Sequence, residues 1–305
     1  MTIAQIEGGL ASQMFGYAAA RRLALKHGAE VLIDPRNYRT YTKFQLELQH
    51  FDVQAVLLSP EQADELCGPA DEGVVVVRPR HLHVDRAVLD LESPHVLMKG
   101  NYVSEDYFHD IEDVLRRDFR RTSTPTSYAV TARALIEQHR DRGRVPVAVH
   151  VRRGDYVSEA HTNSFHGTCT LDYYARAREV VARTVPDPWF FVFSDDPAWC
   201  EANFSGQRTT VLHAPAGTPP VEDMLLMAAC DHHVIANSTY SWWAAWLGAH
   251  DRQVVIGPRP FLADRSHNTD DILPRHWLSV GAGPSPGLRI GSPLGGDRRV
   301  LAEAH

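Results

Sequence analysis

The second half of the chain alternates short apolar runs with stretches of helical periodicity, and this alternation restricts the fold more than any other feature. The apolar runs occupy residues 145–149, 189–193, 209–212, 233–236 and 254–256. Short apolar runs bounded by turn residues predict buried strands. The helical patterns between them cover residues 171–184, 197–203, 221–230 and 239–248. Strands that alternate with helices through short connections predict an α/β fold, with a parallel sheet covered on both faces.

Length and pattern together predict two domains. At 305 residues the chain is longer than one hydrophobic core comfortably supports. The first half has its own alternation, with expected strands at residues 3–6, 31–33 and 74–77 and expected helices at 14–27, 111–121 and 128–140. We place a linker at residues 141–144, which separates an N-terminal domain (residues 1–143) from a second domain (residues 144–280). The Gly-, Pro- and Ser-rich tail, residues 281–305, is expected to be poorly ordered.

Charge and composition exclude several functions. The net charge is −7, and basic residues do not cluster among aromatic ones, so the pattern of a nucleic-acid binder is missing. No apolar run reaches about 18 residues, the length that a spanning helix needs, and the N-terminus has no signal-peptide pattern. We therefore expect a cytoplasmic protein. The four cysteines have no metal-ligand spacing and are expected to be reduced thiols, so no metal site is predicted.

The stretch His150-Val-Arg-Arg-Gly-Asp-Tyr156 follows the strand predicted at residues 145–149. Ligands of open α/β sheets bind at the carboxyl ends of strands, and arginine offers a planar fork of donors that suits phosphate. Arg152 and Arg153 are therefore predicted to hold a diphosphate, with Asp155 beside them. The alternative is that Arg152 and Asp155 form an ion pair that only stabilises the end of the strand.

A run of small polar residues precedes the helix predicted at residues 239–248. It reads Asn237-Ser238-Thr239-Tyr240-Ser241. Backbone N–H groups and small hydroxyls at the start of a helix bind phosphate oxygens, but Ser and Thr are equally common as helix caps. Both interpretations stay open. The tryptophans of the same helix are expected to pack in the core rather than to stack on a sugar; they are Trp242, Trp243 and Trp246.

Two acidic residues and one glycine-containing turn complete the candidates. Asp195 and Asp196 end the strand predicted at residues 189–193; we assign Asp195 to hydrogen bonds with a guanine base and Asp196 to a helix cap. The turn Gly8-Gly9-Leu-Ala-Ser12-Gln13 precedes the first predicted helix, and its glycines let a ligand approach the backbone closely. Because the turn has neither dinucleotide-binding nor P-loop spacing, it identifies no ligand by itself.

Taken together, these stretches resemble the α-1,2-fucosyltransferases of glycosyltransferase family 11. The first turn and helix, GGLASQMFGYAAARRLA, resembles the family's GGLGNQMFQYA motif, and HVRRGDY matches its HxRRxDY motif. The stretches FHGTCTLDYY, FVFSDDPAWC and DMLLMAACDHHVIANSTYSWWAAWLG follow in the family's order. The resemblance runs from about residue 3 to residue 260 and leaves only the tail and part of residues 35–95 uncovered.

The resemblance implies a GT-B fold, in which two Rossmann-like α/β domains face each other across a cleft and the C-terminal domain holds most of the donor. The implied reaction is inverting, metal-independent transfer of L-fucose from GDP-β-L-fucose to the 2-hydroxyl of a galactosyl residue. The implied partners are GDP-fucose and a galactose-containing glycan, with peripheral contact at the inner face of the membrane where that glycan is lipid-linked. No nucleic-acid partner and no cofactor are expected.

The resemblance also assigns roles to the candidate residues. Arg152 is expected to contact the β-phosphate, with Arg153 either second in that role or paired with Asp155. Asp155 is expected either to accept the proton of the attacking hydroxyl or to hold an arginine in place, unless the leaving phosphate takes the proton. The expected donor-binding residues are His150, Arg152, Arg153, Asp195, Asn237, Ser238, Thr239 and Ser241 in the second half and Gly9, Ser12 and Gln13 in the first.

One departure from the family pattern concerns the donor. The family has Gly-Asn before the Gln of its first motif, whereas this chain has Ala11-Ser12. Serine offers one hydroxyl on a short arm where asparagine offers a carboxamide, so a related GDP-6-deoxysugar such as GDP-colitose is an alternative donor. Two further alternatives are that the enzyme forms another linkage, or that the protein binds a GDP-sugar without turnover.

Overall fold

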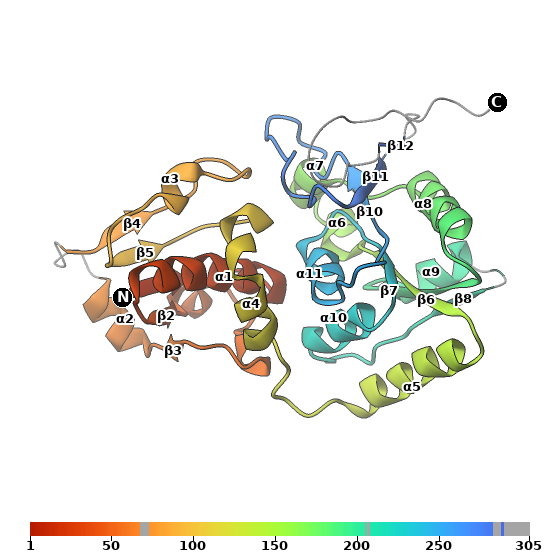
Figure 1. The fold of residues 1–305 in the computed structure, drawn as a ribbon, viewed down its shortest axis with the longest axis horizontal. Coiled ribbons are helices and arrows are strands. Elements are labelled where there is room, and N and C mark those ends of the chain that lie inside the picture. The colour runs from red at the N-terminus through yellow and green to blue at the C-terminus, as the bar shows by residue number, and fades with distance from the viewer. Residues whose placement is uncertain (68–72, 205, 207, 283–287, 290–305) are drawn as a thin grey trace. The chain divides into compact units, whose positions relative to one another are not determined.

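The computed structural model describes residues 1–67, 73–204, 206, 208–282 and 288–289. The chain divides into two compact units, one of Met1–Thr124 with Asp270–Ile272 and the other of Pro125–Thr269 with Leu273–His305. Each unit has its own sheet and its own helices (Figure 1). The α/β class with parallel sheets, predicted from the alternation of strands and helices, is confirmed.

Within the described residues, the first unit has a parallel sheet of five strands in the order β3-β2-β1-β5-β4. The strands are β1 (Thr2–Gln5), β2 (Val31–Asp34), β3 (Val56–Leu57), β4 (Val75–Val77) and β5 (Val96–Met98). The helices are α1 (Leu10–His27), α2 (Pro60–Leu66), α3 (Arg86–Leu89) and α4 (Glu112–Asp118), with 3-10 turns η1 (Arg36–Arg39), η2 (Leu48–His50), η3 (Glu105–Tyr107) and η4 (His109–Ile111).

Helix α1 packs beside β1 through small side chains. Ala18, Ala20 and Ala24 are fully buried, and side chains of this size let the helix approach the sheet closely. The sequence pattern predicts that this helix begins at residue 14. It begins earlier, at Leu10, because the turn before it is completed at Gly9. It ends at Gly28, whose φ of +59° is the left-handed conformation that stops helices and that glycine adopts without strain.

Where the second unit is described, its sheet has seven strands in the order β12-β11-β10-β9-β6-β7-β8, parallel except for the pair β11 and β12. The strands are β6 (Val145–Val151), β7 (Pro188–Ser194), β8 (Thr209–Val211), β9 (His232–Val234), β10 (Val255–Arg259), β11 (Leu278–Gly281) and β12 (Leu288–Arg289). The helices are α5 (Ser127–Asp141), α6 (Gly154–Ser158), α7 (Ala160–His166), α8 (Leu171–Thr184), α9 (Pro197–Asn203), α10 (Pro220–Ala228) and α11 (Thr239–Leu247).

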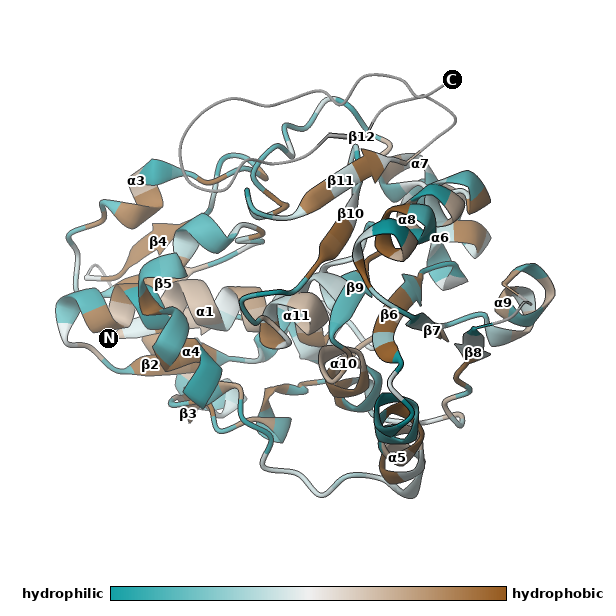
Figure 2. Ribbon diagram, turned by 45° about the vertical axis from the view of Figure 1, so that its right-hand side comes forward, coloured by the Kyte–Doolittle hydropathy of each residue, from teal (hydrophilic) through white to brown (hydrophobic). Residues whose placement is uncertain are grey.

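The core of the second unit surrounds β6. Along this strand Val147 and Val149 are fully buried, as are Val192 of β7 and Val234 of β9. Figure 2 shows β10 and β11 as mainly hydrophobic strands of the same sheet. Strands buried on both faces have continuous apolar sequences, which is why the apolar runs of the second half predict them well. The tryptophans of α11 belong to this interior, as predicted: Trp242 and Trp243 are fully buried and Trp246 is 5% exposed.

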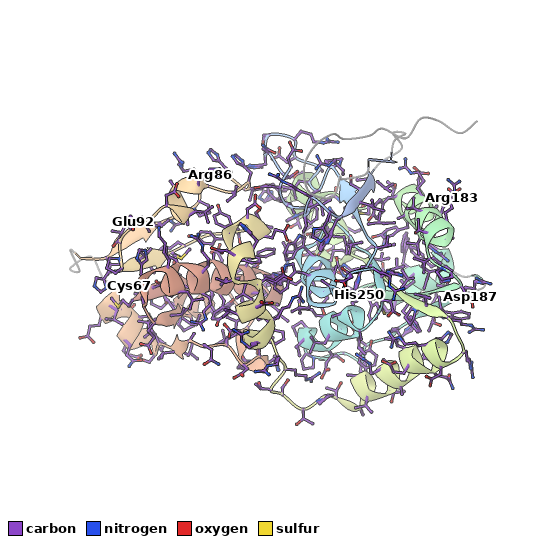
Figure 3. All side chains as sticks on the ribbon, viewed as in Figure 1. Cys67, Arg86, Glu92, Arg183, Asp187 and His250 are labelled. Carbon is purple, nitrogen blue, oxygen red and sulfur yellow. The ribbon has the colours of Figure 1, made fainter. Side chains whose placement is uncertain are left out.

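Charged side chains occupy the outer faces of both units. Figure 3 labels Glu92 and Arg183, whose side chains are 81% and 71% exposed. Both make ion pairs, with Lys26 and Glu179 respectively. Exposed pairs of this kind contribute about 0–1 kcal/mol to stability. The two pairs therefore contribute little to the stability of the fold.

The structure differs from the sequence-based expectations in several places. The division between units lies at Thr124 rather than at residue 143, because α5 packs against α10 and β6 of the second unit. Helices α6 and α7 and strand β11 were not predicted, because the first two are short and polar and the third has only four residues. The expectation of a poorly ordered tail falls largely on residues 283–287 and 290–305, which lie outside the described residues.

Candidate functional site

The strand order of the second unit reverses beside β6. Strands β7 and β8 lie on one side of β6, and β9, β10 and β11 lie on the other, so the connections that leave β6 and β9 diverge. In open α/β sheets this reversal opens a crevice at the carboxyl ends of the strands, where ligands bind. Arg152 and Arg153 directly follow β6, and the stretch from Asn237 to Ser241 follows β9. The fold therefore brings the two principal predicted motifs to one edge of the sheet.

Arg152 lies between two carboxylates at this edge. Its Nη2 donates to Oδ1 of Asp155 at 2.7 Å, and its Nη1 lies 2.9 Å from Oδ2 of Asp195. The register of the sheet explains the second contact, because Val151 pairs with Ser194 and the next residues on both strands are neighbours. The Arg152 side chain keeps 28% of its surface exposed. Two carboxylates thus fix a cation that solvent can still reach.

Arg153 is held by the other acidic residue of the pair that follows β7. Its side-chain Nε donates to Oδ2 of Asp196 at 3.0 Å, and its guanidinium lies 3.9 Å from the ring centroid of Trp199. Asp196 also caps α9 by accepting from the N–H of Trp199 at 3.1 Å, which confirms the predicted helix cap. Arg153 therefore pairs with Asp196.

Asp195 contacts both arginines. Its Oδ2 pairs with Arg152, and its Oδ1 accepts from the backbone N–H of Arg153 at 2.8 Å. The sequence assigned this carboxylate to a guanine base; the structure shows it engaged with the arginines. Asp155 likewise has the arginine contact that the sequence left open as one of its two roles, and the alternative of an Arg152–Asp155 ion pair is the geometry observed.

His150 is buried beside these arginines. It is 5% exposed, and its Nδ1 makes no hydrogen bond within the described residues. Burial, reinforced by the nearby Arg152 charge, lowers the pKa of His150 to about 3, so the imidazole is neutral at pH 7. Its ring lies 5.6 Å from that of Tyr240, near the start of α11. His150 therefore presents a neutral ring, with an unpaired nitrogen, beside the two motifs.

The start of α11 is capped by its own side chains. Ser238 accepts from the N–H of Tyr240 at 3.3 Å, and Ser241 donates its hydroxyl to the carbonyl of Ser238 at 3.3 Å. Asn237 donates its amide to the carbonyl oxygens of His166 and Gly167 at 2.8 and 3.1 Å. The capping interpretation is thus realised for Ser238. The amide of Asn237, expected on the donor, anchors a neighbouring loop. Thr239, which follows Ser238, is half-buried.

The predicted residues of the first turn lie in the first unit, where the buried side chain of Gln13 connects the turn to a neighbouring loop through hydrogen bonds. Its amide donates to the carbonyl oxygens of Gly8 at 3.1 Å and Gln45 at 2.7 Å, and it accepts from the N–H of Glu47 at 2.8 Å. Gly8 has a φ of +71°, and a Cβ there would lie 3.0 Å from Oγ of Ser12. Gly9 caps α1 through its backbone. These contacts give the turn a structural role without any ligand.

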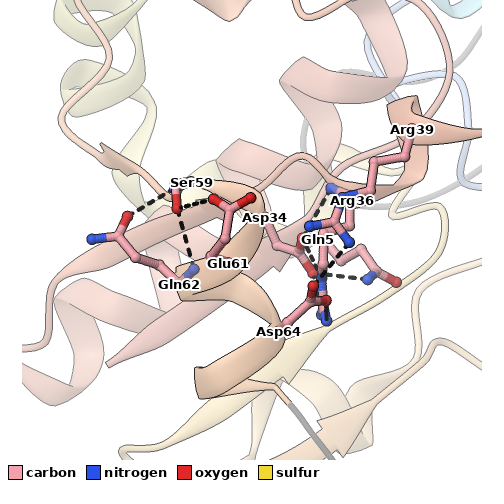
Figure 4. A network of polar contacts seen from close by, with 8 residues as sticks. All are labelled: Gln5, Asp34, Arg36, Arg39, Ser59, Glu61, Gln62 and Asp64. Atoms are coloured by element: carbon pink, nitrogen blue, oxygen red, sulfur yellow. Dashed lines mark hydrogen bonds and ion pairs between the residues drawn. The ribbon is translucent and has the colours of Figure 1, made fainter.

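A charged network at the ends of β1 and β2 was missed by the sequence analysis (Figure 4). The buried Asp34 accepts from Arg36 at 2.7 Å and from the Gln5 amide at 2.8 Å. Arg36 also reaches Asp64, which pairs with Arg39 at 2.9 Å. Hydrogen bonds from Arg36 and Gln5 overcome burial and lower the pKa of Asp34. The signal was an aspartate at the carboxyl end of an apolar strand, as in the case of Asp195.

Two negative findings apply to the residues that the structure describes. These contain no group of three or more His, Cys, Asp or Glu side chains placed to hold a metal ion. They also contain no helix that is both long and apolar enough to cross a bilayer.

An α/β sheet with arginines at the reversal of strand order suits a ligand that carries phosphate, and comparison with known proteins identifies the class of the protein as a glycosyltransferase. Residues 91–280 match glycosyl transferase family 11, and the chain belongs to this family. The family predicted from the sequence motifs is thereby confirmed.

The relatives of the chain include two proteins of Escherichia coli. One, named alpha-1,2-colitosyltransferase, is 29% identical, with 92% of this chain and 99% of that protein covered. The other, named O-antigen biosynthesis glycosyltransferase WbnK, is also 29% identical, with 90% and 99% covered. Galactoside alpha-(1,2)-fucosyltransferase 1 of Rattus norvegicus is 28% identical over 80% of this chain and 62% of its own length.

Two solved structures share the fold. Fucosyltransferase NodZ from Bradyrhizobium has a TM-score of 0.51 at 15% identity and covers 79% of this chain and 91% of its own. NodZ alpha-1,6-fucosyltransferase soaked with GDP-fucose has a TM-score of 0.51 at 18% identity, with 80% and 91% covered. At these identities the likeness describes the arrangement of the chain and not the reaction.

Proposed function

We propose that this glycosyltransferase transfers L-fucose from GDP-β-L-fucose to the 2-hydroxyl of a galactosyl residue in a glycan, with inversion and without a metal ion. The observation that carries the proposal is the position of Arg152, which lies at the reversal of strand order and is fixed by Asp155 and Asp195. The GT-B assignment belongs to the same proposal, with the donor on the second unit and the acceptor on the first.

In this mechanism the protein's own cations stabilise the leaving group. Negative charge grows on the diphosphate as the bond between sugar and oxygen breaks, and a positioned guanidinium stabilises that charge in the transition state. Arg152 fills this role and Arg153 supports it. The N–H groups at the start of α11, with the hydroxyls of Ser238 and Thr239 beside them, supply further donors to phosphate. The neutral His150 ring lies 5.6 Å from the ring of Tyr240 at the start of α11.

Two roles are proposed for Asp155: it positions Arg152, or it accepts the proton of the attacking hydroxyl. Its Oδ1 is occupied by Arg152 at 2.7 Å, which supports the positioning role directly. The proton of the attacking 2-hydroxyl would then pass to the leaving phosphate, or to the second oxygen of Asp155. Asp155→Asn separates these routes, because the amide keeps an oxygen for Arg152 but cannot accept a proton.

GDP-colitose is the second candidate donor. It is favoured by the 29% identity to an alpha-1,2-colitosyltransferase and by Ala11-Ser12 in the first motif. Colitose lacks the 3-hydroxyl of fucose, so a site that hydrogen-bonds this hydroxyl prefers fucose by a large factor, whereas an apolar site discriminates weakly. The two donors therefore test whether the pocket has a partner for that group.

The experiment is a donor and acceptor matrix. GDP-fucose and GDP-colitose are each offered with lactose, N-acetyllactosamine and lipid-linked galactose-terminated glycans, and the linkage of each product is determined by NMR. We expect an α-1,2 product from GDP-fucose. Transfer from GDP-colitose alone would select the second donor. Absence of both transfer and donor hydrolysis would contradict the proposal and favour a GDP-sugar-binding protein without turnover.

A further inference from the structure

Three side chains form a stack that leads away from the arginine cluster. The guanidinium of Arg152 lies 5.4 Å from the ring centroid of Tyr156, a distance at which a cation and an aromatic ring attract each other. Tyr156 also stacks on His166, whose ring lies 4.5 Å away and is inclined by only 11°. Arg152, Tyr156 and His166 are thus connected by ring contacts, in addition to the carboxylates that hold Arg152.

The end of α7 that carries His166 is fixed by its backbone. The carbonyl oxygen of His166 accepts from the Asn237 amide at 2.8 Å and from the N–H of Ala263 at 3.1 Å. The next residue, Gly167, has a φ of +67°, and a Cβ there would lie 2.9 Å from that of Ala263. The ring of His166 is therefore presented to Tyr156 from a rigid turn.

The imidazole itself is held by stacking. Its Nδ1 is buried and makes no hydrogen bond within the described part of the chain. Burial lowers the pKa of His166; the Arg152 charge acts in the same direction and that of Asp155 opposes it. The ring is therefore neutral at pH 7, and it stacks on Tyr156 without adding a second positive charge beside Arg152.

We propose that His166 is a positioning residue, which acts through Tyr156 to hold the Arg152 guanidinium in the orientation that contacts the leaving diphosphate. This inference rests on the proposed function. It also gives a purpose to the Asn237 contacts, which fix the turn that carries His166. A catalytic arginine must be held within about 0.5 Å of its productive position, and the side chains packed around it supply that restraint.

The test compares two replacements of similar bulk. His166→Phe keeps an aromatic ring to stack on Tyr156, whereas His166→Leu fills the space without a ring. We expect the Leu variant to lower kcat for fucosyl transfer roughly tenfold, the upper end of the scale for losing one contact between aromatic rings, with the acceptor KM unchanged. The Phe variant should stay within about twofold of the parent. His161→Leu, at an exposed position of the same helix, is the matched control.

A double-mutant cycle separates positioning from general packing. If His166 acts only through Arg152, then His166→Leu should lower kcat by less than about twofold in an Arg152→Ala background. A tenfold loss in that background, equal loss in the Phe and Leu variants, or a Leu variant with the kcat of the control would each overturn the inference. If the unaltered protein transfers no sugar from either donor, the proposed function fails and the inference falls with it; the other outcomes leave the function intact.

Discussion

Gly154 and Asp195 approach each other so closely that no other residue fits at position 154 without displacing the carboxylate. A Cβ on Gly154 would lie 2.6 Å from Oδ2 of Asp195, the oxygen that pairs with Arg152. The carboxylate cannot simply swing aside, because its other oxygen accepts from the N–H of Arg153 at 2.8 Å. The glycine of the HVRRGDY motif thus permits the contact that fixes the first arginine.

Gly154→Ala should therefore impair the reaction with little effect on the fold. The methyl group displaces Asp195, and displacing a positioning group by about 1 Å can lower the rate by roughly a hundredfold. We expect kcat to fall by about ten- to a hundredfold while the circular dichroism spectrum is unchanged. Gly206→Ala is the control, because a Cβ there meets nothing within 4 Å. Equal activity of the two variants would contradict the relationship.

Arg152→Ala should lower kcat by at least about a hundredfold, the scale for losing one charge-stabilising donor in a transition state. Arg152→Lys should recover only part of this loss, because a point charge cannot contact Asp155, Asp195 and a diphosphate with fixed geometry. Steady-state kinetics with GDP-fucose measure the effect. Arg183→Ala removes an exposed arginine of α8 and should leave kcat unchanged. Near-normal turnover by Arg152→Ala would remove the basis of the proposed mechanism.

The sequence predicts strands β6 to β10 of the second unit, with ends that differ by at most three residues, because these strands have continuous apolar runs. It cannot tell which side chain contacts which. Asp195 and Asp196 are adjacent, and only the register of β6 against β7 shows that Asp195 reaches Arg152 while Asp196 reaches Arg153. The stack of Tyr156 on His166 was also not predicted, because helices α6 and α7, which carry these residues, are short and have no apolar periodicity.

The first unit is less predictable from sequence. Strands β3 and β5 have only two and three residues, which is too short for a pattern, whereas β4 was predicted from its run of valines. Gln13 illustrates the limit for single residues: the motif that contains it was recognised, but its partners Gln45 and Glu47 lie on a loop about which the sequence offers no prediction. A family motif therefore marks an important residue without separating ligand contacts from structural ones.

Activity should be undiminished in EDTA. In the proposed mechanism Arg152 and Arg153 neutralise the diphosphate, a role that a bound Mg²⁺ or Mn²⁺ plays in other enzymes. The measurement is the rate of fucosyl transfer after dialysis against EDTA, with and without added metal. An absolute requirement for a divalent ion would show that the arginines are insufficient, and would contradict the metal-independent part of the proposal.

Gln13→Glu should destabilise the first unit. The Gln13 side chain is fully buried, and its amide donates to two carbonyl oxygens that a carboxylate would instead repel. Leaving buried polar groups without partners costs about 1–3 kcal/mol, and more where a charge is buried. We expect the free energy of unfolding to fall by about 3 kcal/mol in urea titrations. Gln49→Glu, at an exposed position of η2, should change it by less than about 0.5 kcal/mol.

Acid should destabilise the fold through buried histidines, of which His233 in β9 is the clearest. It is 1% exposed, and its ring nitrogens contact the Met227 carbonyl at 2.9 Å and the Gln253 amide at 3.1 Å. Burial lowers the pKa of His233 to about 3. An unfolded chain has a histidine pKa of about 6.5. Between these values the unfolded state binds more protons, so the free energy of unfolding is unaffected above pH 7 and falls as the pH decreases below about 6.5.

Each such histidine should lower the free energy of unfolding by about 2 kcal/mol between pH 7.5 and pH 5.0. His233→Gln removes the titrating group, so urea titrations of this variant should show a drop about 2 kcal/mol smaller than the parent shows over the same pH interval. His161→Gln, at an exposed site, should show the parent's drop. The variant retains His150, whose pKa is also about 3 and which continues to contribute. Equal drops for the parent and His233→Gln would mean that His233 is not neutral in the folded protein at pH 5.0.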